Sequence, residues 1–169
     1  MVLDSVLIKN KKPFNFIEKT ASFLFSSEYR TKSFVNKAIN GANNVLNSLV
    51  EVLELINEDV DSINEEIADN LIKQFDFALQ LSTPLINSLE ELSNEYFSLN
   101  DPLAYEIKLL LNKTIEIDET INKVITKLEY IKALRISESV QNLTFNSLNT
   151  LWNESEDNDL VDLYKESLD

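Results

Sequence analysis

PLAYEIKLLLNKTIEIDETINKVITKLEYIKALR, residues 102–135, is the stretch that decides the fold of this chain. Its apolar positions recur in alternating steps of four and three, which is the heptad spacing of a helix that packs along one stripe. The stripe consists of Leu103, Ile107, Leu110, Thr114, Ile117, Ile121, Val124, Leu128 and Ile131. Asn100 or Asp101 can cap this helix and Pro102 suits its first turn. We therefore expect a rod about 50 Å long, whose stripe other helices must cover.

Two amphipathic segments upstream supply the covering helices. Residues 45–56 and 63–78 carry apolar side chains at helical spacing, and the polar residues 57–61 separate them. Ser62 followed by Glu65 has the pattern of a capping box at the start of the second helix. At Pro84 we expect a kink or a restart, after which the apolar pattern continues to Leu99.

Two shorter helices complete the prediction. One covers residues 31–40 and ends before Gly41, which permits a break or a tight contact; the other is capped by Ser137 and ends near Trp152. The sequence thus predicts an all-α, elongated, antiparallel four-helix-type bundle over residues 31–152. A basic, aromatic-rich segment (1–30) precedes the bundle and an acidic tail (153–169) follows it. A short strand at residues 2–8 is the one alternative to helix.

The composition excludes several classes of function. The 169 residues contain no histidine, no cysteine and a single glycine. The commonest general base, the thiolate nucleophile and the glycine-rich phosphate loop are therefore missing. The net charge of −14 is the sum of +4 over residues 1–40 and −18 over residues 41–169, and the acidic part opposes nucleic-acid binding. With no membrane-spanning apolar run and no signal-peptide core, we expect a soluble, cytoplasmic protein.

Four carboxylates offer one site for chemistry. Glu51 and Glu54 precede the turn at residues 57–61, and Glu66 and Asp69 follow it. In an antiparallel helix hairpin, these two pairs would face each other near the turn. Oxygen ligands of this kind suit Mg²⁺, which needs neither histidine nor cysteine.

This E-x-x-E and E-x-x-D arrangement resembles that of the all-alpha nucleoside triphosphate pyrophosphatases, the MazG-like family. Residues 65–73 resemble the family's second helix, and residues 127–130 with Arg135 resemble its downstream basic segment. The resemblance implies Mg²⁺-dependent hydrolysis of a nucleotide to monophosphate and pyrophosphate, with Glu51, Glu54, Glu66 and Asp69 holding the metal. The same carboxylates lie opposite the apolar stripes of their helices, so a solvated helix face accounts for them as well.

The C-terminal region suggests a second resemblance. Residues 137–139, residues 148–153 and the acids that lead to Tyr164 resemble the closing segment of small bacterial antitoxins. That resemblance implies an acidic, aromatic-anchored arm that wraps a basic toxin. In the alternative, Trp152 and Tyr164 anchor the tail onto the bundle itself. The candidate partner-binding residues are Trp152, Leu160, Leu163 and Tyr164.

The N-terminal segment has its own alternatives. Phe14, Ile17, Ala21 and Leu24 have helical spacing and can pack on the bundle, with the lysines in solvent. A membrane-surface helix is disfavoured because Asp4 and Glu18 interrupt a face that should be cationic. An arm that docks on an acidic neighbour remains open.

These observations favour a non-enzymatic helical-bundle protein that acts through protein–protein interaction, as a scaffold, adaptor or assembly component. Its partner would be another protein or a copy of itself in an oligomer. We expect no cofactor, with Mg²⁺ required only under the pyrophosphatase alternative.

Overall fold

The computed structural model describes residues 15–16, 19–21 and 30–154. Three long helices make up most of this part: α3 (Lys32–Glu58), α4 (Glu65–Ser98) and α5 (Ala104–Glu154). A single 3-10 turn, η2 (Val60–Ser62), joins α3 to α4. No strand occurs within the described ranges, so the predicted all-α class is confirmed; residues 2–8 lie outside them.

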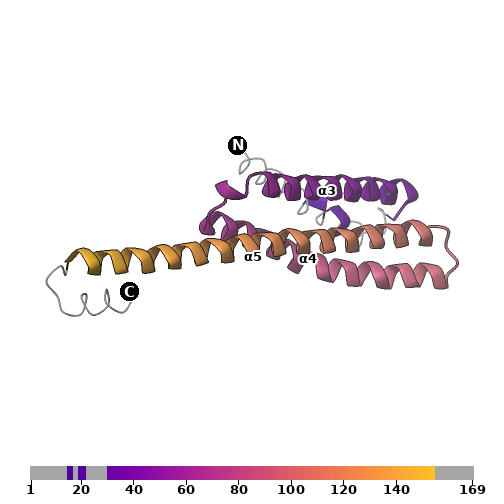
Figure 1. Ribbon diagram of the computed structural model, residues 1–169. Helices are drawn as coiled ribbons and strands as arrows, with labels where there is room; N and C mark the ends of the chain where they lie inside the picture. The colour runs from indigo at the N-terminus through magenta and orange to yellow at the C-terminus, as the bar shows by residue number, and fades with distance from the viewer. Residues whose placement is uncertain (1–14, 17–18, 22–29, 155–169) are drawn as a thin grey trace.

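Helix α5 is the centre of the bundle. Both α3 and α4 pack along it, whereas α3 and α4 have little direct contact with each other. Figure 1 shows the successive helices running in alternating directions, with α5 between α3 and the C-terminal half of α4. The predicted heptad stripe explains this position, since residues Ile107, Leu110, Thr114, Ile117, Ile121, Val124, Leu128 and Ile131 are each at most 1% exposed. Leu103 at its start is half-buried.

The start of α4 differs from the prediction. Asn64 is the N-cap, because its Oδ1 accepts a hydrogen bond of 2.8 Å from the backbone N–H of Ile67. Ser62 instead donates its hydroxyl to the backbone oxygen of Asp59 within η2, at 2.8 Å. The predicted Ser62 capping box is therefore wrong. The two extra residues of extended chain allow Ile63, 3% exposed, to enter the core before the helix begins.

The structure bears on two predicted interruptions. Helix α3 passes Gly41 without a break, and an added Cβ there would meet Phe16 Cδ2 at 3.8 Å. That is an ordinary contact distance, so neither a break nor a tight contact is observed at Gly41. Helix α4 likewise continues through Pro84, so a restart there is wrong. Burial of Leu85 and Leu89 on the next two turns compensates for the backbone hydrogen bond that proline cannot make.

A Schellman motif ends α4. Asn100 has a positive φ of 54°, and its N–H donates to the carbonyl of Phe97 while that of Asp101 donates to Tyr96. The Asp101 carboxylate then accepts from the N–H of Leu103 at 2.8 Å, which starts the turn into α5. Leu99, predicted to lie on the apolar face of α4, is 68% exposed because this turn carries it outward.

Helix α5 does not end near Arg135. It continues for 51 residues, about 76 Å at 1.5 Å per residue, and projects well beyond the other helices (Figure 1). The prediction of a separate, packed helix capped by Ser137 is therefore wrong. No glycine or proline follows Pro102, so nothing in the backbone interrupts the helix. We call residues 136–154 of α5 the extension and the packed remainder the body.

Candidate functional site

The four carboxylates of the predicted Mg²⁺ site are not brought together. Glu51 and Glu54 lie on α3 and Glu66 and Asp69 on α4, and these helices pack on α5 rather than on each other. The hairpin contact on which the prediction rested is therefore not formed. Within the described ranges, no group of three or more Asp or Glu side chains is placed to hold a metal ion.

Asp69 instead belongs to an ion-pair group. Its carboxylate accepts from Lys132 of α5 at 2.7 Å and pairs with Lys73 of α4 at 2.8 Å. The hydrogen bond from Lys132, followed by that from Lys73, lowers the pKa of Asp69 to about 2. The same contact with Asp69 raises the pKa of Lys132. Neither group is poised to exchange a proton near neutral pH, so this pair holds helices together rather than offering acid–base chemistry.

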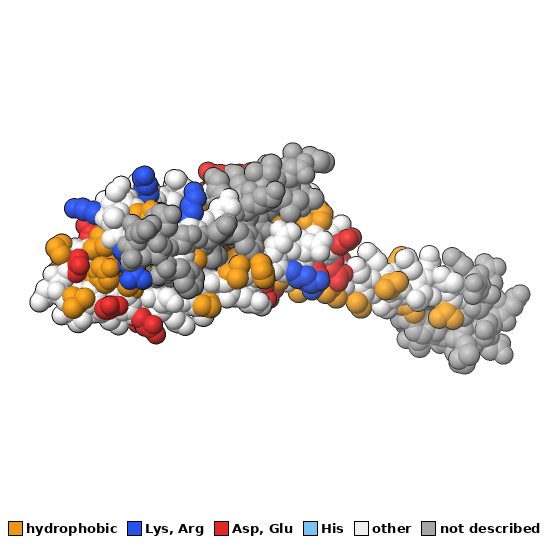
Figure 2. All heavy atoms as spheres, turned by 180° about the vertical axis from the view of Figure 1, so that it is seen from behind, with side chains coloured by type: hydrophobic (Ala, Val, Ile, Leu, Met, Phe, Trp, Pro, Cys, Tyr) orange, Lys and Arg blue, Asp and Glu red, His pale blue; other side chains and the backbone are white. Residues whose placement is uncertain are grey.

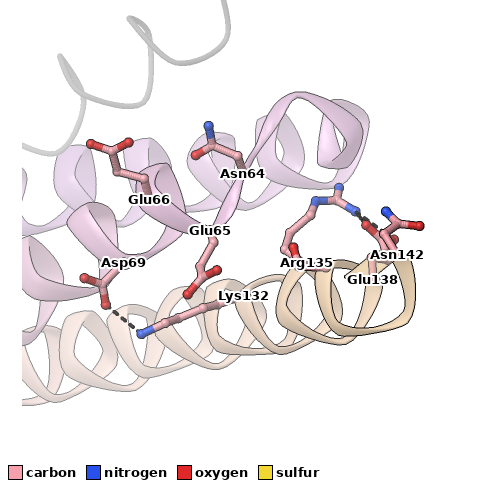
Figure 3. Close-up of a pocket in the computed structure, with 9 residues that line it drawn as sticks. Asn64, Glu65, Glu66, Asp69, Lys132, Arg135, Glu138 and Asn142 are labelled. Atoms are coloured by element: carbon pink, nitrogen blue, oxygen red, sulfur yellow. Dashed lines mark hydrogen bonds and ion pairs between the residues drawn. The ribbon is translucent and has the colours of Figure 1, made fainter. Parts of the chain in front are cut away.

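An open hollow of about 540 Å³ surrounds this pair at the base of the extension. Figure 3 shows Lys132 reaching from α5 to Asp69, with Arg135 one turn further along α5 beside Glu138. The lining of the hollow is mixed in charge, and its two cations already have carboxylate partners. This arrangement gives an anionic ligand no unpaired cation to bind.

Arg135 has a structural role that the sequence did not reveal. Its guanidinium donates to the backbone oxygens of Val60 at 2.7 Å and Ile63 at 2.9 Å, and it contacts Glu138 at 3.1 Å. It thereby fixes the α3–α4 connection onto α5 where the body ends. The sequence signal that could have indicated this role is the position of Arg135, which follows Ile131 by four residues and ends the apolar stripe.

The extension carries the longest run of exposed apolar side chains in the described part of the chain. Every residue from Ile136 to Trp152 is exposed, and Figure 2 shows hydrophobic side chains along the projecting helix. The exposed fractions are Ile136 41%, Val140 56%, Leu143 66%, Phe145 69%, Leu148 47%, Leu151 58% and Trp152 39%. We call these seven residues the apolar arc.

The apolar arc does not continue the buried stripe of the body. Beyond Ile131, the heptad frame falls on Arg135, Glu138 and Asn142, which are polar. Val140 follows Ile131 by nine residues, which places it about 180° around the helix at 100° per residue. The extension therefore presents its apolar side away from the direction in which α5 meets the body.

The predicted partner-binding and N-terminal residues are only partly described. Trp152 lies on the extension, so it does not anchor the chain onto the body, while Leu160, Leu163 and Tyr164 lie outside the described residues. In the N-terminal segment the packed side chains are Phe16 and Thr20, whose hydroxyl donates to the Phe16 carbonyl at 2.9 Å. Ala21 is half-buried; Phe14, Ile17 and Leu24 lie outside the described ranges.

Comparison with known proteins yields no relative. No protein-family model, no curated protein and no solved structure matches this chain. Among the described helices, none is both long and apolar enough to cross a membrane. Any assignment of function therefore rests on the geometry and chemistry of the chain itself.

Proposed function

We propose that this chain acts through protein–protein contact and that the apolar arc of the extension is its contact surface. The observation that carries this proposal is the run of exposed apolar side chains on a helical segment about 28 Å long that continues past the buried stripe of the body. Large apolar side chains that lie together on a surface are typical of an interaction site.

The local sequence of the extension supports the same proposal. It is rich in Ser, Thr, Asn and β-branched or aromatic residues, which are weak helix formers. Isolated helices of this length are marginal in water even when their residues favour helix. Burial of each large apolar side chain contributes roughly 1.5–3 kcal/mol. A partner that covers the arc therefore supplies the stability that local propensity does not.

The two other predicted functions each depend on a particular group of acidic side chains. A Mg²⁺-dependent pyrophosphatase needs a carboxylate cluster, and the described residues hold none. The acids of the predicted antitoxin-like arm, from Glu154 to Asp162, lie almost entirely outside the described residues, so that alternative stays a prediction. Hydrolysis of a nucleoside triphosphate that requires Mg²⁺ and is lost in Glu66→Gln would contradict the proposal.

Site-specific photocrosslinking tests the contact surface. A benzophenone amino acid is placed at Leu143, on the arc, or at the adjacent Asn142, on the polar side, in cells that make the chain. Both positions are exposed, so they differ only in the side of the helix they sample. We expect a discrete crosslinked protein from position 143 and little from position 142. Absence of a product from both positions, or equal yields, would overturn the proposal.

A further inference from the structure

We propose that the partner of the extension is the extension of a second copy of this chain, paired with it in antiparallel orientation. This inference rests on the proposed function, because it names the partner of the same apolar arc. Three observations carry it: the charge of the extension, its length beyond the body, and the area it exposes.

The extension contains the longest uncharged run of a highly charged chain. The whole chain has a net charge of −14, yet residues 139–153 contain no Asp, Glu, Lys or Arg. A partner of opposite charge would have nothing to recognise there. Two identical uncharged helices, in contrast, meet without like-charge repulsion, and a two-fold pairing of identical surfaces is the commonest form of oligomer.

The length of the extension determines the orientation. In an antiparallel pair the two acidic bodies lie at opposite ends of an overlap about 28 Å long. At physiological salt this is several times the Debye length of about 8 Å, so repulsion between the bodies is largely screened. A parallel pair would place the two bodies side by side. Repulsion between the two bodies therefore favours the antiparallel arrangement.

The exposed apolar area of the extension fits a weak interface between two copies. Ile136, Val140, Leu143, Phe145 and Leu148 are each 41–69% exposed. Phe145 lies about 160° around the helix from Leu143, so one partner helix would cover the other four side chains. At ordinary side-chain areas these four expose on the order of 350 Å² per copy, and two copies about 700 Å², which is the size of a weak, transient interface. The predicted dimer is thus one that dissociates on dilution.

The same features disfavour a lipid surface. Amphipathic helices that bind membranes usually carry Lys or Arg on the polar side, which attracts anionic lipids. Here that side carries Glu138, Ser139, Asn142, Asn146 and Asn149. The acidic body would oppose binding to an anionic membrane further.

Sedimentation equilibrium of the full chain tests the dimer. We expect a monomer–dimer equilibrium whose dissociation constant rises at least about tenfold in Leu143→Asp, because the new carboxylate would lose its hydration in the interface. The matched control Asn142→Asp adds the same charge one residue away on the polar side. We expect it to change the constant by less than about twofold.

Disulfide mapping tests the orientation, and the chain suits it because it contains no cysteine. Single cysteines are introduced at 136, 140, 143, 147 and 151 on the arc side and at 142 and 146 on the polar side. An antiparallel pair gives self-linked dimers mainly from the middle positions 140–147, less from 136 and 151, and few from the polar side. Equal yields from all arc positions would show a parallel pair and overturn the orientation.

The outcomes separate this inference from the proposed function. A full chain that stays monomeric while position 143 crosslinks to a different protein overturns the inference and leaves the proposed function standing. A monomer that gives no crosslink overturns both. A monomeric chain that co-migrates with phosphatidylcholine vesicles in a flotation gradient also overturns the inference, because the arc then binds lipid.

Discussion

Lys132 Nζ on α5 lies 2.7 Å from Asp69 Oδ1 on α4, and this contact joins the two helices one turn before the body ends. Its effect on stability depends on pH. Because the pKa of Asp69 falls from 3.8 to about 2, the unfolded chain takes up the proton first as the pH drops. The stabilisation is complete above about pH 4 and is lost as the pH falls through about 2.

The pH dependence of Asp69→Asn checks this contact. In urea denaturation, the variant is less stable than the wild type at pH 6, and the difference shrinks towards zero between pH 4 and pH 2. Lys132→Gln removes most of this pH dependence and Lys73→Gln removes less, because the bond to Lys132 has the larger effect on the carboxylate. A difference that stays constant down to pH 2 would contradict the assignment.

Arg135 gives the second prediction. Arg135→Gln leaves the carbonyls of Val60 and Ile63 without their guanidinium donor, so we expect a loss of about 1–3 kcal/mol in the free energy of unfolding. Glu138→Gln is the control, since it removes only an ion pair whose carboxylate is half exposed and should cost about 0.5 kcal/mol or less. Equal effects of the two substitutions would mean that the carbonyl contacts contribute nothing.

Asp118 is the site of a substitution that we expect to stabilise the fold. Its carboxylate accepts a hydrogen bond from Ser82 across the α4–α5 contact, and burial raises its pKa although that bond opposes the rise. The folded chain therefore disfavours the ionised form, which costs stability at neutral pH. Asp118→Asn removes the charge and keeps an oxygen acceptor for Ser82, so it should raise the thermal midpoint at pH 7. The gain should diminish as the pH falls and Asp118 takes up its proton. A lower midpoint at pH 7 would contradict this explanation.

Gly41 offers a second stabilising substitution. It lies inside α3 without a positive φ, and an added methyl group would meet Phe16 at an ordinary contact distance of 3.8 Å. Gly41→Ala should raise the free energy of unfolding by up to about 1 kcal/mol through helix propensity alone. Gly41→Leu, which needs more room beside Phe16, should lose that gain. Destabilisation by alanine would mean that the packing there is tighter than the contact distance indicates.

The sequence predicted the body of the fold because its strongest signal is local. Ile107 through Ile131 keep an unbroken heptad spacing, and a helix with such a stripe has to bury it. The termini of the helices were less predictable. Ser62 and Asn64 are both good caps, and only the burial of Ile63 between them decides that Asn64 is used.

The candidate site was predicted less well, for two physical reasons. The predicted approach of Glu54 to Glu66 across a helix hairpin assumes that consecutive helices pack on each other. In the structure, α3 and α4 both pack on α5 instead. The residues after Arg135 carry a helical apolar pattern, but a pattern cannot say whether the covering surface lies in the same chain. The structure adds that Leu143 is exposed, so the described part of the body does not cover it.

Hydrogen exchange across α5, measured on the full chain at several protein concentrations, tests directly whether a second copy covers the apolar arc. We expect slow exchange at residues 107–131 at every concentration, because this segment is buried in the body. Residues 140–150 should exchange rapidly in dilute solution and become protected as the concentration rises and a second copy covers the arc. Protection of residues 140–150 that is unchanged across all concentrations, or absent from all of them, would contradict the account.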